Sequence, residues 1–208
     1  MIEETIQTIA QIIDTFMTEE TIQTIAQIIG IFAAALNIYS FQCKSKRGII
    51  TFQLFGGMLF TINFFMIGAI TGAIMNALAI IRALLFLFKE KLRLNDKALV
   101  GGLILSFLAT YALTFTVFGV EPKAINFVIE ALPVIGMSAA TVSFNMKNAA
   151  RVRLLGITLS SPSWLIYNIY YFSIGAILCE AISIVSIAIG MARHDIKRKP
   201  KEENTTNM

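Results

Sequence analysis

Polar side chains inside apolar stretches are the candidates for chemistry in this sequence. Residues 160–193 read SSPSWLIYNIYYFSIGAILCEAISIVSIAIGMAR, and Glu180 is their one carboxylate. A charge is costly in hydrocarbon, so such a residue is normally held by a partner or a cavity, or serves a function. In a wet cavity Glu180 could bind a polar or cationic solute, or take part in a proton-coupled step. Otherwise it is neutral or paired, for example with Arg82 or a tyrosine hydroxyl, and holds helices together; the same alternatives apply to Glu130.

Other chemistries lack the residues that they need. The single histidine, His194, lies in a charged tail, and Cys43 and Cys179 belong to different segments without metal-ligand spacing. The sequence shows no nucleophile and base pair and no phosphate-binding loop. We therefore expect no enzymatic activity, no metal and no cofactor.

The composition predicts a membrane protein with an all-α fold. The chain of 208 residues is 56% hydrophobic and 14% charged, with a mean hydropathy of +0.73. A soluble bundle could not bury several successive apolar runs, each long enough to cross roughly 30 Å of hydrocarbon. We predict seven transmembrane helices, at Ile22–Phe41, Ile49–Ile67, Ala69–Phe88, Ala98–Phe118, Ala124–Met146, Leu154–Phe172 and Ile174–Ala192.

The positions of the basic residues predict the orientation. Sixteen of the 17 Lys and Arg residues fall on one side of the predicted spans, and Lys123 is the exception. The positive-inside rule places that side in the cytoplasm, the N-terminus outside and the C-terminus inside. This asymmetry explains the net charge of +4 without a nucleic-acid partner.

The N-terminal region contains a tandem duplication. Residues 3–13 read EETIQTIAQII, and residues 19–29 repeat them. Met17 is therefore an alternative start to Met1. The first copy is too short and acidic to span a membrane, and its acidic residues contradict the basic n-region of a secretory signal. We predict an extramembrane segment at 1–21, a first three-helix unit at 22–88, a linker helix at 98–118, a second three-helix unit at 124–192 and a basic cytoplasmic tail at 193–208.

The polar residues in the spans lie at similar depths. At 1.5 Å per residue, Asn76, Glu130 and Glu180 lie about 9 to 10 Å from the outer ends of their helices. We predict a solute site that has the following residues in its lining: Asn76, Glu130, Trp164, Asn168, Ser183 and Glu180. Pro133 and Pro162 remove helix hydrogen bonds and are candidate hinges.

Short matches link the two halves of the chain. Ser40, Phe41 and Lys44 recur 103 residues later, and the run IGAI at 67–70 recurs at 174–177. Parallel repeats of this kind place substrate sites at their interface in many transporters. The three, one, three arrangement resembles the SWEET, MtN3 and PQ-loop group of carriers.

Three sequence blocks resemble a more specific family. GAIMNALAIIR at 72–82, EALPVIG at 130–136 and WLIYNIYYFSIGAILCE at 164–180 are similar to the bacterial YgjV-like inner-membrane proteins. This resemblance implies a multi-pass protein of the bacterial inner (plasma) membrane and no particular activity.

The SWEET pattern is matched only in part. Where SWEET carriers have a proline in each of four pore helices, this chain has Pro133 and Pro162, but Gly30 and Phe55 or Gly56 in the first half. The asparagine that SWEET carriers use as a sugar contact on the third helix is present as Asn76, whereas its counterpart on the seventh falls on Ser183. This difference argues against the hypothesis that the substrate is a sugar.

The sequence is consistent with two functions of different classes. The first is an alternating-access carrier or facilitator of a small polar solute or proton, in contact with the lipid bilayer and able to form a homo-oligomer. The second is a membrane interaction or assembly protein whose intramembrane polar residues serve helix packing. A connected cavity reaching Asn76 and Glu180 would favour the first, and a dry core the second.

Overall fold

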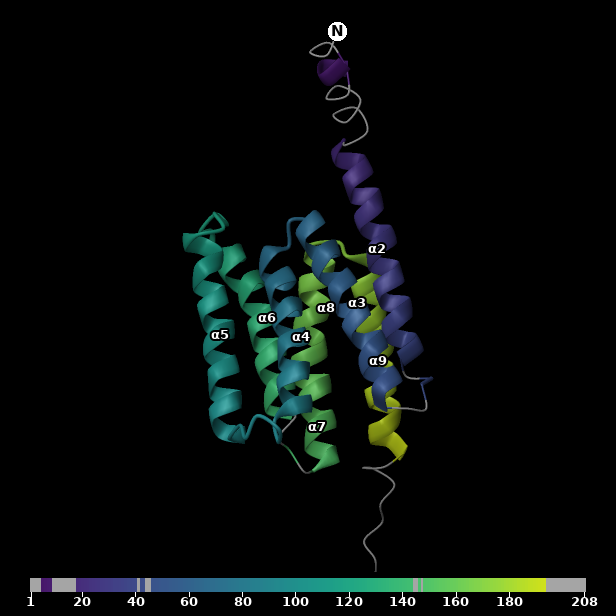
Figure 1. Ribbon diagram of the computed structural model, residues 1–208, viewed down its shortest axis with the longest axis vertical. Coiled ribbons are helices and arrows are strands. Elements are labelled where there is room, and N and C mark those ends of the chain that lie inside the picture. The colour runs from purple at the N-terminus through teal and green to yellow at the C-terminus, as the bar shows by residue number, and fades with distance from the viewer. Residues whose placement is uncertain are drawn as a thin grey trace, which may run out of the picture.

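The chain folds into helices joined by short turns. The computed structural model describes residues 5–8, 18–40, 42–43, 46–143, 146 and 148–193, and Figure 1 shows their arrangement. Its elements are α2 (Glu19–Ser40), α3 (Lys46–Met66), α4 (Ile70–Phe88), α5 (Asp96–Thr116), α6 (Ala124–Ser143), α7 (Ala149–Leu155), the π-helical η1 (Gly156–Ser160), α8 (Ser161–Tyr170) and α9 (Ile174–Met191). The elements α7, η1 and α8 follow one another without a break and together form one rod.

Five of the described helices are long and apolar enough to cross a membrane. They are α2, α4, α5, α6 and α9, and α3 contributes a shorter apolar stretch, Thr51–Met66. Large apolar side chains such as Leu105, Phe55 and Val185 are exposed on the outside of the bundle. Such a surface requires a lipid environment, because a soluble protein rarely exposes large contiguous apolar patches.

Several boundaries differ from the expected ones. Helix α6 ends at Ser143 rather than Met146, and α7 begins at Ala149, five residues before the expected start at Leu154. The reason is local: Asn148 caps α7, its side chain accepting hydrogen bonds from the backbone of Ala150 and Arg151 at 2.9 and 3.3 Å. The expected duplicated segment and basic tail lie mostly outside the described residues.

The helices close into a ring. Going round it, α2 contacts α3, α3 contacts α4, α4 contacts α6, α6 contacts α8, α8 contacts α9, and α9 returns to α2. Helix α5 stands outside this ring, against α4 and α6 (Figure 1). The ring therefore brings the first group of helices, α2 to α4, against the second, α6 to α9, at two separate boundaries.

The rod α7–η1–α8 corresponds in position to α3 but is one residue longer. Helix α3 covers residues 46–66 and the rod covers 149–170, so the starts are 103 residues apart and the ends 104. A π-helical turn contains an extra residue compared with an α-helical one. The described bounds of the rod thus exceed those of α3 by one residue, and the rod contains the π-helical segment η1.

The turns that follow these two helices have the same backbone pattern. Gly68 (φ 75°) and Phe172 (φ 55°) occupy the left-handed region at equivalent places. In each turn the next amide bonds back five residues: Ala69 N to Phe64 O at 2.8 Å, and Ser173 N to Asn168 O at 2.9 Å. Helices α4 and α9 then begin 104 residues apart, at Ile70 and Ile174.

At this spacing Asn76 corresponds to Glu180. The IGAI match had suggested a spacing of 107, which pairs Asn76 with Ser183 instead. Gly175 lies in the first helical turn of α9.

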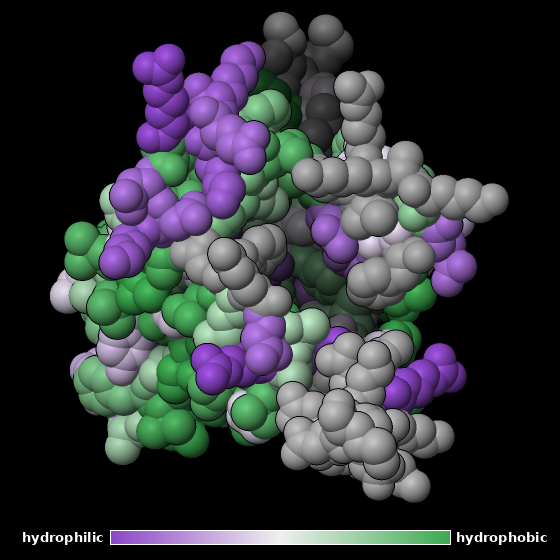
Figure 2. All heavy atoms as spheres, turned by 90° about the horizontal axis from the view of Figure 1, so that it is seen from below, coloured by the Kyte–Doolittle hydropathy of each residue, from purple (hydrophilic) through white to green (hydrophobic). Residues whose placement is uncertain are grey.

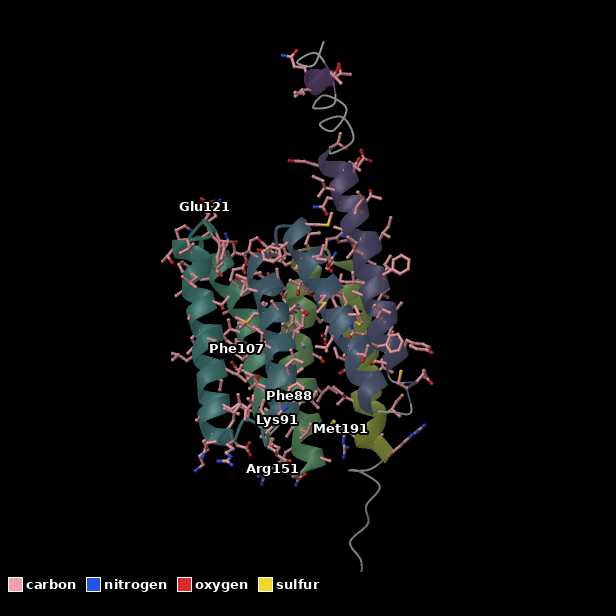
Figure 3. All side chains as sticks on the ribbon, in the orientation of Figure 1. Phe88, Lys91, Phe107, Glu121, Arg151 and Met191 are labelled. Carbon is pink, nitrogen blue, oxygen red and sulfur yellow. The ribbon has the colours of Figure 1, made fainter. Side chains whose placement is uncertain are left out.

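The two ends of the bundle differ in charge. The α3–α4 and α8–α9 turns lie at the end drawn at the top of Figure 1, here called the upper end. Figure 3 shows Glu121 at this end, and Lys91 and Arg151 at the opposite, lower end. Lys91 and Arg151 thus lie at one end of the bundle and the acidic Glu121 at the other.

Candidate functional site

A cavity of about 190 Å³ lies inside the ring, and we call it the central cavity. Its lining comes from α3, α4, α6, α8 and α9 and consists of Phe60, Phe64, Asn76, Ala79, Arg82, Met137, Trp164, Asn168, Ala176, Cys179 and Glu180. Figure 2, a view from the lower end, shows the molecule hollowed near the centre of the ring, with hydrophilic side chains inside. The cavity therefore lies between the two groups of helices.

Two further cavities adjoin the central one. One of about 210 Å³ lies between α2, α3 and α4, and its lining includes Asn37 and Gln53. Another, of about 200 Å³, lies where α2 meets α9, and its lining includes Ser183. Both share Phe60 and Asn76 with the central cavity. The lining of the first reaches Gln53 and Ala83 in the lower halves of α3 and α4, and that of the second reaches Ile38 near the lower end of α2, so the hollow continues toward the lower end.

Three pairs of equivalent positions line the central cavity. At the spacing of 104 residues set by the turns, Phe60 corresponds to Trp164, Phe64 to Asn168 and Asn76 to Glu180. The rings of Phe64 and Trp164 stack with centroids 6.2 Å apart, which joins α3 to α8 across the cavity. Within each pair the member from the second group of helices is the more polar one.

Three residues of the central cavity carry hydrogen-bond acceptors. Asn76 donates its Nδ2 to Gly72 O at 3.1 Å, and its Oδ1 takes no part in that bond. Asn168 is 1% exposed, and its Oδ1 has no hydrogen-bond partner among the described residues. Glu180 adds a carboxylate in the same lining.

Arg82 is the cationic member of the central cavity. Its Nη1 donates to Thr141 Oγ1 on α6 at 3.1 Å, close to the lower end of that helix. The structure places it both against α6 and in the lining of the cavity.

Glu130 lies apart from these cavities. It is 1% exposed, accepts a hydrogen bond from the hydroxyl of Tyr171 and lines none of the three cavities described above. Its surroundings are those of the packing alternative, in which a tyrosine hydroxyl partners the acid. Asn76, Trp164, Asn168 and Glu180 share the central cavity, Ser183 lines the cavity next to it, and Glu130 joins neither group.

Hydrogen bonds across the two groups of helices close the upper end. Gln27 on α2 uses both atoms of its amide: Nε2 donates to Phe172 O at 2.7 Å, and Oε1 accepts from Ile174 N at 3.0 Å. Asn63 on α3 accepts from Ser173 Oγ at 2.7 Å. We call these bonds, together with the bond from Gly72 N to Tyr167 Oη at 2.9 Å, the upper seal.

Glycines bring the backbones together at the same end. A Cβ on Gly175 would lie 2.0 Å from the carbonyl oxygen of Gly30, so α9 and α2 touch through their main chains. A Cβ on Gly72 would lie 2.6 Å from the ring of Tyr167. Small residues of this kind permit close packing of membrane helices. Both contacts join one group of helices to the other.

The two prolines occupy different settings. Pro133 is buried inside α6. Pro162 is the second residue of α8, directly after η1. A π-helical turn and a proline are both known causes of helix bending, so the rod carries two such features in succession.

Several other lining residues have no strong functional signal in the sequence. Asn37 and Cys179 each line two of the cavities. In the sequence, each is distinguished only by a polar or polarizable side chain within an apolar run. Phe60 and Phe64 carried no signal, because an aromatic residue in a membrane helix is ordinary. Only the closure of the ring identifies them.

The fold and this site define a multi-pass membrane protein with a polar cavity enclosed by its helices. The chain belongs to the Imp-YgjV family of bacterial inner membrane proteins, whose match covers residues 24–198. It is thus a multi-pass protein of the bacterial inner membrane. Comparisons with curated proteins and with solved structures gave no match.

Proposed function

We propose that this protein is a non-enzymatic carrier or facilitator of a small polar solute that works by alternating access. In this proposal seven helices span the membrane in a three, one, three arrangement like that of SWEET and PQ-loop carriers. The seven are α2, α3, α4, α5, α6, the rod α7–η1–α8, and α9. The N-terminus lies outside and the lower end faces the cytoplasm.

The observation that carries the proposal is a polar cavity closed at one end. Asn76 and Glu180 line the hollow between the two groups of helices. The upper seal lies above them, and Figure 2 shows the opposite end hollowed. A cavity open to one side only is what alternating access requires of each of its states.

The equivalence of the two groups supports a rocking motion. The matched turns at Gly68 and Phe172 and the one-residue difference absorbed by η1 are what a duplicated three-helix unit with a later insertion would give. Repeats of this kind rock against each other around a site at their interface. Pro133 and Pro162 are the proposed hinges.

A native thiol can test the direction of opening. Cys179 lines the central cavity, and the chain has only two cysteines, so Cys43→Ser leaves Cys179 as the sole thiol. A small, charged, membrane-impermeant thiosulfonate would be applied to spheroplasts, which expose the outer face, and to inside-out vesicles. We expect Cys179 to react in inside-out vesicles and to be protected in spheroplasts.

Two controls fix the orientation of the membranes. Cys43 alone, in a Cys179→Ser variant, reports the cytoplasmic side, and Glu121→Cys in a cysteine-free background reports the outer side. Reaction of Cys179 from the outside alone would contradict the proposed state. Reaction from neither side would favour the alternative function, a membrane interaction or assembly protein whose polar residues serve packing. Uptake of a solute panel into proteoliposomes then tests transport itself.

A further inference from the structure

The central cavity is chemically one-sided. Its acceptors come from the second group of helices, as the carboxylate of Glu180 and the unpartnered Oδ1 of Asn168, which is 1% exposed. The equivalent positions in the first group hold Asn76 and Phe64. A buried acceptor without a donor is costly, so a ligand that brings N–H groups to this place would satisfy it.

The central cavity also has an aromatic wall. Phe60 and Phe64 line the cavity, and Phe64 stacks on Trp164 at 6.2 Å. Aromatic faces attract cations and also accommodate short apolar chains. The cavity of about 190 Å³ limits the ligand to a small molecule.

We propose that the central cavity binds a small solute with a protonated primary amine, which donates to Glu180 and Asn168 while its apolar part packs on Phe60 and Phe64. This inference rests on the proposed carrier function and names its substrate class. An ammonium group has three donors and no acceptor, which matches the acceptors of Glu180 and Asn168. Arg82 lies in the same lining, where its guanidinium held against Thr141 would suit a carboxylate at the far end of the solute.

The chain carries its own reporter for the test. Trp164 lines the central cavity and is the only tryptophan in the sequence, so intrinsic tryptophan fluorescence of the purified protein reports this site alone. The probes are butylamine, 1-butanol, butyrate and 2-aminobutyrate, which share a carbon skeleton and differ in charge. We expect saturable changes with butylamine or 2-aminobutyrate and none with butyrate or 1-butanol. Preference for 2-aminobutyrate over butylamine would assign the carboxylate to Arg82, and the reverse would leave Arg82 without a ligand role.

Glu180 variants identify the group that recognises the amine. Glu180→Gln should weaken amine binding at least about tenfold, because a charge-assisted hydrogen bond is lost, whereas Glu180→Asp should retain most of it. Glu121→Gln, which changes an exposed acid paired with Lys123 at 2.7 Å, is the matched control and should bind as the wild type does. An unchanged emission maximum without ligand shows that a variant is folded.

Two results would overturn the inference. If 1-butanol binds as well as butylamine and Glu180→Gln binds both equally, the cavity takes neutral solutes and only the amine class is wrong. If none of the four probes changes the emission of Trp164, the amine class is again rejected. The carrier function is then judged separately, by the labelling of Cys179.

Discussion

The contact between Gly30 and Gly175 gives a sharp test of the upper end. Gly175→Ala places a Cβ 2.0 Å from Gly30 O, 2.2 Å from Gly30 C and 2.7 Å from Ile31 N. All three are backbone atoms, so no side chain can rotate away. Ordinary contact requires about 3.5 Å, so α2 and α9 must separate by on the order of 1 Å.

Three effects set the size of the change. Overpacking costs about 1 to 3 kcal/mol. The two hydrogen bonds of Gln27 to the α8–α9 turn lengthen, and each is worth on the order of 0.6 kcal/mol in a membrane protein. Alanine stabilises the helix by up to about 1 kcal/mol because its helix propensity is higher than that of glycine. The overpacking cost and the weakened hydrogen bonds exceed the gain in helix propensity. We therefore expect Gly175→Ala to lower the free energy of unfolding by about 1 to 3 kcal/mol.

The assay is thermal unfolding in detergent, followed by the fluorescence of Trp164. A loss of this size corresponds to a fall in Tm of about 2 to 10 °C. Gly101→Ala is the matched control, because a Cβ on Gly101 meets nothing within 4 Å and the helix propensity gain is the same. If Gly175→Ala unfolds at the same temperature as Gly101→Ala, the two backbones do not touch as described.

Three further outcomes are expected. Gln27→Ala removes two hydrogen bonds from the upper seal and should make Cys179 reactive from the outer face; continued protection in spheroplasts would show that Gln27 does not hold this end closed. Tyr167→Phe keeps the ring but leaves Gly72 N–H without its acceptor, so we expect a loss of about 1 to 3 kcal/mol on unfolding, and an unchanged Tm would argue against that bond. Removal of residues 1–16 should leave membrane insertion and Tm unchanged, and loss of folded protein would show that the first copy of the duplication is needed.

Hydropathy and charge were sufficient for the helical class and the helix positions. Long apolar runs and the clustering of basic residues have strong local signals, so most expected spans lie within a few residues of the observed helices. The boundaries near Met146 and Leu154 shifted, because a single capping asparagine decides where α7 begins. The left-handed residue in the turn before α9 is Phe172, and a phenylalanine in the sequence gives no indication of this conformation.

The candidate site was harder to obtain from the sequence. Depth along a helix placed Asn76 and Glu180 at one level, and this needs only the helical rise. Depth does not say which way a side chain points, and for this reason Glu130 was grouped with them although it packs on Tyr171. The aromatic wall depends on α3 meeting α8 across the ring, a long-range contact that no local pattern records.

The π-helical turn η1 has a consequence for the direction in which α8 faces. One residue advances an α-helix by about 100°, and a π-helical turn contains about one residue more than an α-helical turn. Trp164 and Asn168 lie beyond η1, and both line the central cavity. If residues 156–160 were α-helical instead, everything beyond them would be rotated by roughly 100° about the axis of the rod. The π-helical turn therefore helps to determine that these two side chains reach the cavity.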